Sequence, residues 1–430
     1  MTGGIQLANA LSTSLRLVPP RRLLVRGVNW LGDAVMTMPA LCRLREAFPE
    51  AHITLLTFPK LADIYRMLPA IDSVMTLNRD ESPFKVAARL RAENFDTGLI
   101  LPNSVRTALP FWLAGIPRRV GYGGRGRTLL LTQPVQRGQG IVRIQKRPLA
   151  EIGRLTGLSV SNNATPVLKL PLPRLRVSSR ISSRIFSLAT ADLHPTPDLH
   201  HLHAYLQLVS ALGAESTLTA PQMVVPEVLC EALRERLQIP ASPDRPLFGL
   251  NPGAEYGLAK RWPEERFIET AIELHRRFHC RWLVLGGPAD RELSTRIADG
   301  IEKGIGTGTN GTGIEKNQNM VSGTQSVWNV AGQTSLTELC AALRLCDLVL
   351  TNDTGPMHVA AAVGTRVVVP FGSTSAALTG PGMPADPRHR LLQSNAVCAP
   401  CFHRVCPIDF RCMEGISVAH VVSAVSEIYA

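Results

Sequence analysis

Short apolar runs alternate with amphipathic stretches in the first part of the chain. Five of these runs have the length of buried strands, and they cover residues 23–27, 52–57, 74–77, 97–101 and 119–121. Apolar residues at helical spacing from Ala34 to Phe48 predict a helix after the first run, and Pro49 ends it. Because strands and helices alternate, we expect a mainly parallel, doubly wound sheet.

The same rhythm restarts in the second part. Strand-length apolar runs recur at residues 247–250, 281–285, 347–351 and 366–370. Helical patterns occupy residues 263–278, 290–298, 336–343 and 356–363. The sequence therefore predicts a second α/β unit, joined to the first through a proline-containing linker region at residues 214–244.

Three segments follow neither pattern. Residues 1–20 end in Pro19-Pro20 and are expected to form a loose N-terminal arm. Residues 142–199 contain a basic, serine-rich run, and residues 304–323 are rich in Gly, Thr and Asn with almost no apolar side chains. We interpret residues 142–199 as an insertion in the first unit and residues 304–323 as a flexible insertion in the second, both tolerated as surface loops.

Composition limits the class of protein. The chain has 430 residues, of which 45% are hydrophobic and 19% charged, which suits two globular domains. Aromatic residues make up only 5%, which argues against a protein that stacks on single-stranded nucleic acid. No apolar run reaches the ~18 residues of a membrane-spanning helix, and the first residues do not resemble a secretory signal.

The chain is strongly basic. Its formal net charge is +12, from 46 basic and 34 acidic residues. Such an excess indicates an anionic partner, and charge alone leaves open nucleic acid, a phosphorylated small molecule or an acidic membrane surface. A basic surface that serves only solubility is the other interpretation.

A loop with two glycines follows the first predicted strand. It reads GVNWLGDAVMTMPA at residues 27–40. It matches neither the G-x-G-x-x-G of dinucleotide-binding folds nor the phosphate loop of nucleoside triphosphatases, so both classes are disfavoured. Asp33 falls near the start of the next helix. It is either an N-cap or a functional carboxylate at the edge where open α/β sheets bind ligands.

Two loops of the second unit suit a phosphorylated ligand. The first reads NPGAEYGLAKRWP at residues 251–263 and places Lys260 and Arg261 just before a helix. A helix N-terminus, free backbone donors and these cations would together bind a diphosphate. A solvated basic turn is the alternative.

The second of these loops reads TNDTGPMH at residues 351–358. Asp353 or Thr354 can cap the following helix, Gly355 tightens the turn, and proline fits the first helical turn. Backbone N–H groups aimed at one point would bind a phosphate, and His358 lies one turn into the helix. A core or capping histidine is the alternative. If the two halves face each other across a cleft, the loops at residues 27–40, 251–263 and 351–358 fit an enzyme that joins a phosphate-linked donor to an acceptor.

Four cysteines cluster near the C-terminus. They are spaced as Cys398-x2-Cys401-x4-Cys406-x5-Cys412. Four thiols within fifteen residues are compatible with zinc, although the spacing is not that of two separated Cys-x2-Cys pairs. Packed or redox-labile thiols in a surface loop are the alternative. The other five cysteines are expected to be reduced core thiols.

Several of these motifs together resemble glycosyltransferase family nine, and within it the ADP-heptose:lipopolysaccharide heptosyltransferases, above all those of type II. The resemblance covers most of residues 21–140 and 200–430. It is carried by the loop at residues 27–40, by PGAEYG and AKRWP within 252–263, by residues 351–362, by FGSTS at 371–375 and by CAPCFHRVCP at 398–407.

The resemblance implies an α/β GT-B fold, with two Rossmann-like doubly wound domains facing a central cleft. Residues 21–225 would form the acceptor-side domain and residues 240–430 the donor-binding domain. The implied reaction transfers heptose from ADP-heptose to the inner core of lipopolysaccharide with inversion. The alternatives are a family member for another core sugar or acceptor, and a non-catalytic protein that binds a sugar nucleotide or an anionic lipid.

The resemblance also implies roles for single residues. Asp33 matches the general base, and Lys260 matches the basic residue at the donor phosphates. Asp353, Thr354, Gly355 and His358 match the donor-binding turn, and Asp290 falls near an acidic contact to the donor nucleoside. No cofactor is implied, and the chain has no Asp-x-Asp pair of the kind that holds a metal in other sugar-nucleotide enzymes.

The implied acceptor is a lipid-anchored lipopolysaccharide core. It carries phosphates and carboxylates, so Asn29, Arg118 and Arg119 are expected to contact it, with Arg125 and Arg127 as further candidates. The enzyme is then expected to be cytoplasmic and peripheral at the inner face of the inner membrane. Nucleic acid is not expected as a partner, because no nucleic-acid-binding module is recognised.

Overall fold

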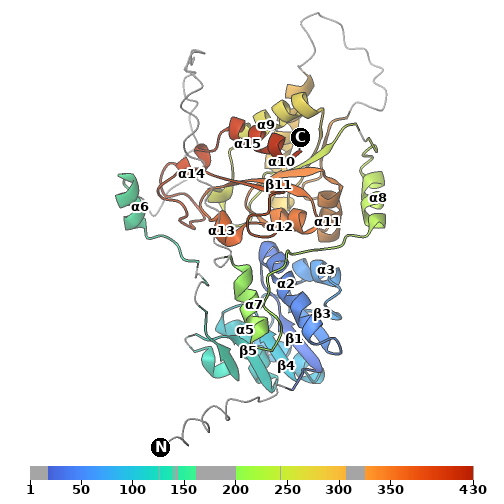
Figure 1. The fold of residues 1–430 in the computed structure, drawn as a ribbon, viewed down its shortest axis with the longest axis vertical. Helices are drawn as coiled ribbons and strands as arrows, with labels where there is room; N and C mark the ends of the chain where they lie inside the picture. Colours follow the sequence, from blue (N-terminus) through green and yellow to red (C-terminus); the bar gives the residue numbers. More distant parts are fainter. Residues whose placement is uncertain are drawn as a thin grey trace, which may run out of the picture. The chain divides into compact units, whose positions relative to one another are not determined.

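The chain forms two compact units (Figure 1). The computed structural model describes residues 18–124, 126–138, 141, 144–160, 200–242, 244–306 and 325–429. The first unit contains the described residues up to Gln139 together with Leu202–Thr219, and the second contains those of Gly140–His201 and Ala220–Ala430. Most of the predicted arm at 1–20 and of the predicted insertions at 142–199 and 304–323 lies outside the described residues.

The described part of the first unit has a six-stranded parallel sheet in the order β3-β2-β1-β4-β5-β6. The register pairs Leu24 of β1 with Thr54 on one side and Gly98 on the other. All five predicted strands are confirmed, and β6 is an addition. The strands are β1 (Arg22–Arg26), β2 (His52–Thr57), β3 (Ser73–Thr76), β4 (Thr97–Ile100), β5 (Arg118–Tyr122) and β6 (Gln133–Val135).

The helices of the first unit pack where their apolar residues recur at helical spacing. In α4, Val86, Ala87 and Leu90 are buried, and they join Leu24 and Phe111 in one core with α5. A second pair of helices, α2 and α7, also pack against each other. The elements are α2 (Leu31–Ala47), α3 (Ala62–Arg66), α4 (Pro83–Ala92), α5 (Val105–Leu113), α7 (Leu202–Ser210), η1 (Pro59–Leu61) and η2 (Thr128–Leu130).

The second unit repeats this plan. Its described residues form a six-stranded parallel sheet in the order β12-β11-β10-β7-β8-β9. Phe248 and Trp282 pack edge to face on neighbouring strands, with ring centroids 5.7 Å apart. The strands are β7 (Leu247–Asn251), β8 (Arg281–Val284), β9 (Val327–Asn329), β10 (Leu348–Thr351), β11 (Arg366–Phe371) and β12 (Arg390–Gln393).

The predicted helices of the second unit are confirmed as α9, α10, α11 and α12. Of these, α11 begins at a capping box in which Ser335 and Glu338 each bond the other's backbone N–H. The helices are α6 (Leu149–Thr156), α8 (Glu227–Arg236), α9 (Glu264–Phe278), α10 (Arg291–Gly306), α11 (Leu336–Leu345), α12 (Gly355–Ala362), α13 (Ala376–Thr379), α14 (Arg411–Glu414) and α15 (Val418–Tyr429), with η4 (Leu258–Lys260) and η5 (Pro288–Asp290).

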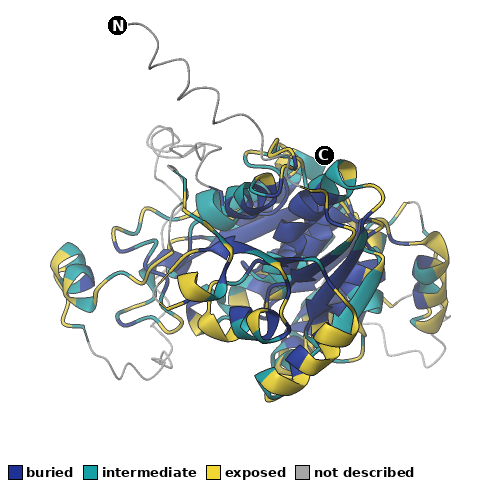
Figure 2. Cartoon of the chain, turned by 90° about the horizontal axis from the view of Figure 1, so that it is seen from below, coloured by how far each residue is buried: buried dark blue, intermediate teal, exposed yellow. Residues whose placement is uncertain are grey.

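Burial follows the layers. Figure 2 shows the strands in dark blue, and the exposed residues in yellow on helices and loops at the outside. Because each sheet is parallel, the loops that follow its strands all meet at one edge, the carboxyl edge, where open α/β sheets bind ligands. The two loops after β7 and β10 therefore converge in the second unit, and the loop after β1 lies at the corresponding edge of the first.

Candidate functional site

Asn352 ties together two of the loops at the carboxyl edge of the second sheet. Its side-chain amide donates to the carbonyl of Pro252 at 2.7 Å, and its amide oxygen accepts from the backbone N–H of Trp262 at 2.9 Å. Asn352 is fully buried, so both bonds form away from water. The segment that carries Lys260 is thereby fixed against the turn that follows β10.

Lys260 and Asp353 form an ion pair within this edge. The Lys260 Nζ lies 2.6 Å from the Asp353 Oδ2, and the Thr374 hydroxyl donates to the same oxygen. Asp353 is only 2% exposed. The Lys260 ammonium also lies 5.0 Å from the centre of the Tyr256 ring. A positive charge is therefore held in place by a buried carboxylate and an aromatic face, as recognition of an anionic ligand requires.

The backbone before Lys260 needs glycine. Gly257 has φ +155°, and a Cβ there would lie 3.0 Å from the carbonyl carbon of Arg404. That carbonyl accepts from the N–H of Ala259 at 2.9 Å, and the Tyr256 hydroxyl donates to the carbonyl of Phe402 at 2.7 Å. Residues 257–260 are thus packed directly on the cysteine-rich loop at residues 398–412. This contact sets the position of the Lys260 ammonium.

The capping roles predicted for the turn after β10 are not what the structure shows. Thr354 occupies the N-cap position of α12, but its side chain makes no capping bond. Asp353 uses its carboxylate on Lys260 and Thr374 instead of the helix. Gly355 and Pro356 occupy the first helical turn, as predicted. The predicted turn is present, and the tertiary contact with Lys260 decides what the Asp353 carboxylate binds.

His358 is a neutral imidazole beside this ion pair. Burial lowers its pKa to about 3, and the nearby negative charge of Asp353 only partly opposes that shift. The charges of His200 and Lys260 lower the pKa further. His358 therefore adds no positive charge at neutral pH and contributes packing and a neutral ring nitrogen.

Asp290 lies next to the same loops. Its Oδ1 is 3.0 Å from the Arg261 guanidinium, and its Oδ2 accepts from the N–H of Gly287 at 3.2 Å. A Cβ at Gly253 would lie 2.5 Å from the Asp290 carboxyl carbon, so glycine is needed for this approach. The structure brings Asp290 to the predicted edge. It also shows that Asp290 pairs with Arg261 as Asp353 pairs with Lys260, so each of these two cations is held by its own carboxylate.

Two residues of the loop after β11 were not predicted to have roles. Thr374 donates to Asp353, and the Ser373 hydroxyl is buried with no hydrogen-bond partner among the described residues. An unpaired buried hydroxyl at a ligand-binding edge is a candidate ligand contact. The signal that could have found them is position, because FGSTS directly follows a buried strand just as the other two loops do.

In the first unit, Asp33 is the third residue of α2. The N-cap is Trp30, so the N-cap alternative for Asp33 is wrong. Asp33 is half-buried and lies near the hydroxyls of Tyr65 and Tyr205. Burial raises the pKa of both hydroxyls, and the negative charge of Asp33 adds to the increase. A carboxylate in the first turn of a helix interacts favourably with the helix dipole.

A cavity of about 170 Å³ opens at the carboxyl edge of the first sheet. Asn29 lines it, together with the arginines Arg26, Arg79 and Arg106. Arg26 is buried and donates to the carbonyl of Leu56 at 3.2 Å and to the amide oxygen of Asn29 at 3.3 Å. Burial lowers the pKa of Arg26 to about 10, so it remains charged at neutral pH. The cavity is therefore suited to an anion.

Arg118 and Arg119 lie elsewhere. They begin β5, so they stand at the amino edge of the parallel sheet, opposite the edge that carries Asn29. Arg118 donates to the Gln133 side chain at 3.1 Å, and Arg119 donates to the carbonyl of Leu130 at 2.8 Å. The structure does not bring them together with Asn29.

Of the two further arginine candidates, the structure describes only Arg127. Arg127 is buried and donates to the carbonyls of Ile100, at 3.1 Å, and Pro102. Its guanidinium is therefore used inside the unit. Arg125 lies outside the described residues.

The four clustered cysteines pack together. They line one void of about 10 Å³ with Ile152 of α6, and all four thiols are free. Burial raises the pKa of Cys398, Cys401 and Cys412, that of Cys412 to about 12. Among the residues that the structure describes, no group of three or more His, Cys, Asp or Glu is arranged to hold a metal ion. The structure shows packed thiols at this place in the fold, and the raised pKa values disfavour redox-labile thiolates.

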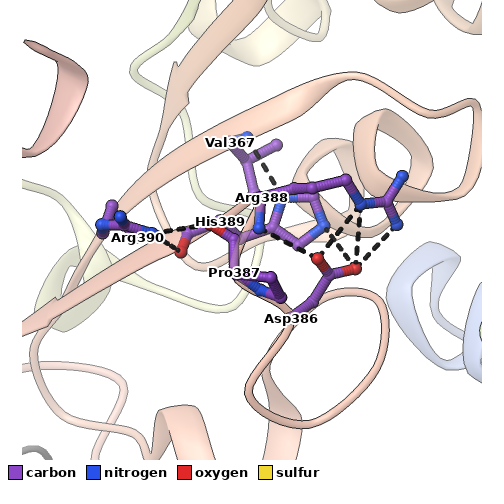
Figure 3. A network of polar contacts seen from close by, with 6 residues as sticks. All are labelled: Val367, Asp386, Pro387, Arg388, His389 and Arg390. Carbon is purple, nitrogen blue, oxygen red and sulfur yellow. Dashed lines mark hydrogen bonds and ion pairs between the residues drawn. The ribbon is translucent and has the colours of Figure 1, made fainter. Parts of the chain in front are cut away.

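The amino edge of the second sheet carries a different polar network (Figure 3). His389 accepts from the N–H of Val367 at 3.3 Å through Nδ1, and its Nε2 lies 3.7 Å from the Asp386 carboxylate. Arg388 pairs with the same carboxylate at 2.7 Å. Burial lowers the pKa of His389 to about 4. Since Val367 lies at the start of β11, the network braces the sheet at the edge opposite Lys260.

Comparison with known proteins adds independent information. The model of the family described as glycosyltransferase family 9 (heptosyltransferase) matches residues 172–410. Lipopolysaccharide heptosyltransferase 2 of Escherichia coli is 25% identical over 368 residues, which cover 84% of this chain and 85% of that protein. Lipooligosaccharide heptosyltransferase 2 of Campylobacter jejuni is 31% identical over 178 residues, which cover 41% of this chain and 49% of that protein.

Solved structures agree on the fold. The structure of E. coli ADP-heptose lps heptosyltransferase II has a TM-score of 0.65 and 21% identity, and the match covers 95% of this chain and 98% of that chain. The family 9 glycosyltransferase of Veillonella parvula has a TM-score of 0.66 and 19% identity, with 96% and 98% covered. The expected class of two Rossmann-like doubly wound domains of GT-B type is confirmed. Within the described ranges, no helix has both the length and the apolar character needed to cross a bilayer. With a family model that matches more than half of its residues, the chain belongs to glycosyltransferase family 9, the heptosyltransferases.

Proposed function

We propose that this chain is an inverting transferase of type II, which moves heptose from ADP-heptose to the inner core of lipopolysaccharide. The observation that carries the proposal is the Lys260–Asp353 pair at the carboxyl edge of the second sheet. The names of the relatives support the same reaction, because they are lipopolysaccharide and lipooligosaccharide heptosyltransferases 2. We assign the donor to the second unit and the acceptor to the first.

On the donor side, Lys260 would bind the diphosphate. As the bond between the anomeric carbon and the diphosphate oxygen breaks, negative charge grows on the departing ADP. An ammonium that is already held by Asp353 and Thr374 needs no reorganisation to stabilise that charge. The loss of such a group typically costs roughly 10²–10³ in turnover. Ser373 offers a further hydroxyl donor on the same edge.

On the acceptor side, Asp33 would act as the general base. It takes the proton of the acceptor hydroxyl while that oxygen attacks the anomeric carbon from the face opposite ADP, so the configuration inverts. Such proton transfer is worth roughly 10²–10⁴ in rate. Its place in the first turn of α2 puts the carboxylate at the positive end of the helix dipole.

The anionic part of the acceptor would bind in the cavity of the first unit. Arg26, Arg79 and Arg106 supply positive charge there, and Asn29 supplies an amide. The lining contains one carboxylate, that of Glu81, which is paired with Arg89 at 2.8 Å. The cavity arginines therefore replace Arg118 and Arg119 in this proposal.

A mass-resolved transfer assay tests the proposal. Purified protein is incubated with ADP-heptose and a series of defined inner-core acceptors of increasing length. We expect one acceptor to gain the mass of one heptose residue, and no gain when the donor is an ADP-hexose. A gain only with another donor would move the chain to a different core sugar. No gain with any donor or acceptor would overturn the proposal.

A further inference from the structure

An apolar stripe runs along the solvent side of α5. Val105 is 44% exposed and Trp112 is 47% exposed, and the half-buried Leu109 lies between them at helical spacing. The opposite side of the helix is buried through Ala108 and Phe111. An exposed stripe at i, i+4 and i+7 is unusual, because a helix on a sheet normally turns polar residues outward.

Two neighbouring elements extend this stripe. Phe84 of α4 is 69% exposed, and Leu129 of η2 is 85% exposed. Arg91 of α4 donates to the carbonyl of Leu113 at the end of α5 at 2.6 Å, so the two helices lie side by side. On the other flank, α5 contacts η2. We call the exposed side chains of these elements the α4–α5 face; its apolar members are Phe84, Val105, Leu109, Trp112 and Leu129.

The charge around the α4–α5 face is positive. Helices α4 and α5 contain four basic residues, Lys85, Arg89, Arg91 and Arg106, and no acidic residue. Of these, Arg89 pairs with Glu81 at 2.8 Å. Lys85 and Arg106 are exposed beside the apolar side chains. Apolar and aromatic side chains among cations are the combination that binds an anionic bilayer surface.

The α4–α5 face also adjoins the cavity of the first unit. Pro83, Ser104 and Arg106 line that cavity, and they are the chain neighbours of Phe84 and Val105. An anionic group reached from the bilayer could therefore enter the cavity without its lipid anchor leaving the membrane.

We propose that the α4–α5 face docks on an anionic lipid bilayer, with Phe84 and Trp112 inserted among the lipids and Lys85 and Arg106 at the headgroups. This inference rests on the proposed function in one respect: docking would bring the cavity of the first unit to a lipid-anchored acceptor. The occupant is a bilayer because exposed apolar side chains and exposed basic side chains, among them Lys85 and Arg106, share the same two helices.

Vesicle binding and transfer are measured together for Phe84→Asp/Trp112→Asp. The matched control is Val224→Asp/Val228→Asp, which alters two equally exposed apolar residues of the second unit. Vesicles of phosphatidylethanolamine with phosphatidylglycerol are compared with vesicles of phosphatidylcholine. Each protein is also assayed with a membrane-embedded acceptor and with its water-soluble, deacylated form. Circular dichroism and gel filtration with light scattering check folding and oligomeric state.

We expect the first variant to partition onto anionic vesicles at least ~10-fold more weakly and to lose transfer to the embedded acceptor in proportion. Its transfer to the soluble acceptor should equal that of wild type, and the control should match wild type throughout. Wild-type binding should weaken with salt and be weak on phosphatidylcholine. Vesicle binding equal to that of wild type overturns the inference. If the variant changes its oligomeric state instead of its vesicle binding, the inference is also overturned, because the face then contacts a second copy of the chain. Failure of the proposed function differs, because it abolishes transfer to both acceptors in every protein.

Discussion

Replacing Lys260 with Met removes the positive charge from a buried ion pair and leaves the aliphatic stem in place. Asp353 then keeps only the Thr374 hydroxyl on its Oδ2, at a position that is 2% exposed. Removing one partner of a buried pair costs about 3–5 kcal/mol of unfolding free energy, because the remaining charge is not solvated. A charged hydrogen bond to a diphosphate is worth about 1.5–3 kcal/mol, so the affinity for ADP should fall roughly ten- to a hundredfold.

A second variant separates these two effects. In Lys260→Met/Asp353→Asn both charges are gone, so most of the lost stability should return while ADP binding stays weak. Urea denaturation measures stability, and isothermal titration with ADP measures affinity. Lys303→Met, on the exposed side of α10, serves as the control. The reasoning is refuted if the single variant is as stable as wild type, or if the double variant binds ADP with wild-type affinity.

Three further expectations concern other parts of the structure. The pKa of His389 is about 4 in the folded chain against 6.5 for the free side chain, so the unfolded state binds the proton first. The contribution of His389 to the unfolding free energy should therefore fall by about 3 kcal/mol as pH drops from 6.5 to 4, in addition to the loss that His358 causes, and His389→Gln should reduce the slope in urea titrations. Gly253→Ala places a Cβ against Asp290 and should weaken ADP binding in isothermal titration; an unchanged affinity would show that the loop adapts. Arg106→Ala should raise KM for the acceptor but not for the donor, whereas Arg119→Ala should leave both KM values unchanged, and equal effects would contradict the assignment of the cavity.

The sequence predicted the described strands that lie inside the two sheets and the edge strand β3, but it missed the edge strands β6, β9 and β12. Apolar runs such as residues 52–57 are buried on both faces, and that double burial is what produces a run. The edge strands β6 and β12 are only half-buried, and β6 consists of Gln133, Pro134 and Val135. With one side open, their sequences need no apolar run, so periodicity carries no signal there.

The candidate site was predictable in position but not in pairing. Loops after parallel strands share one edge, so the predicted strand order already places the loops of Lys260 and Asp353 at the same edge of the sheet. Which carboxylate neutralises which cation depends on side-chain packing between residues far apart in the chain. Arg261 takes Asp290, and Lys260 takes Asp353.

For the acceptor, charge was the signal that pointed to Arg118 and Arg119. Both begin β5 and so stand at the edge opposite Asn29, a placement that charge alone does not predict. Arg26 ends β1 and therefore lies at the carboxyl edge, as Asn29 does. In the sequence it falls inside the apolar run at residues 23–27, so it gives no separate signal.

The Asp33→Ala variant tests the central claim most directly, when donor binding and transfer are measured on the same sample. If Asp33 is the general base, ADP-heptose binds to the variant with the wild-type Kd, while turnover falls by roughly 10²–10⁴. Turnover at the wild-type rate, with the donor bound equally well, would contradict the account.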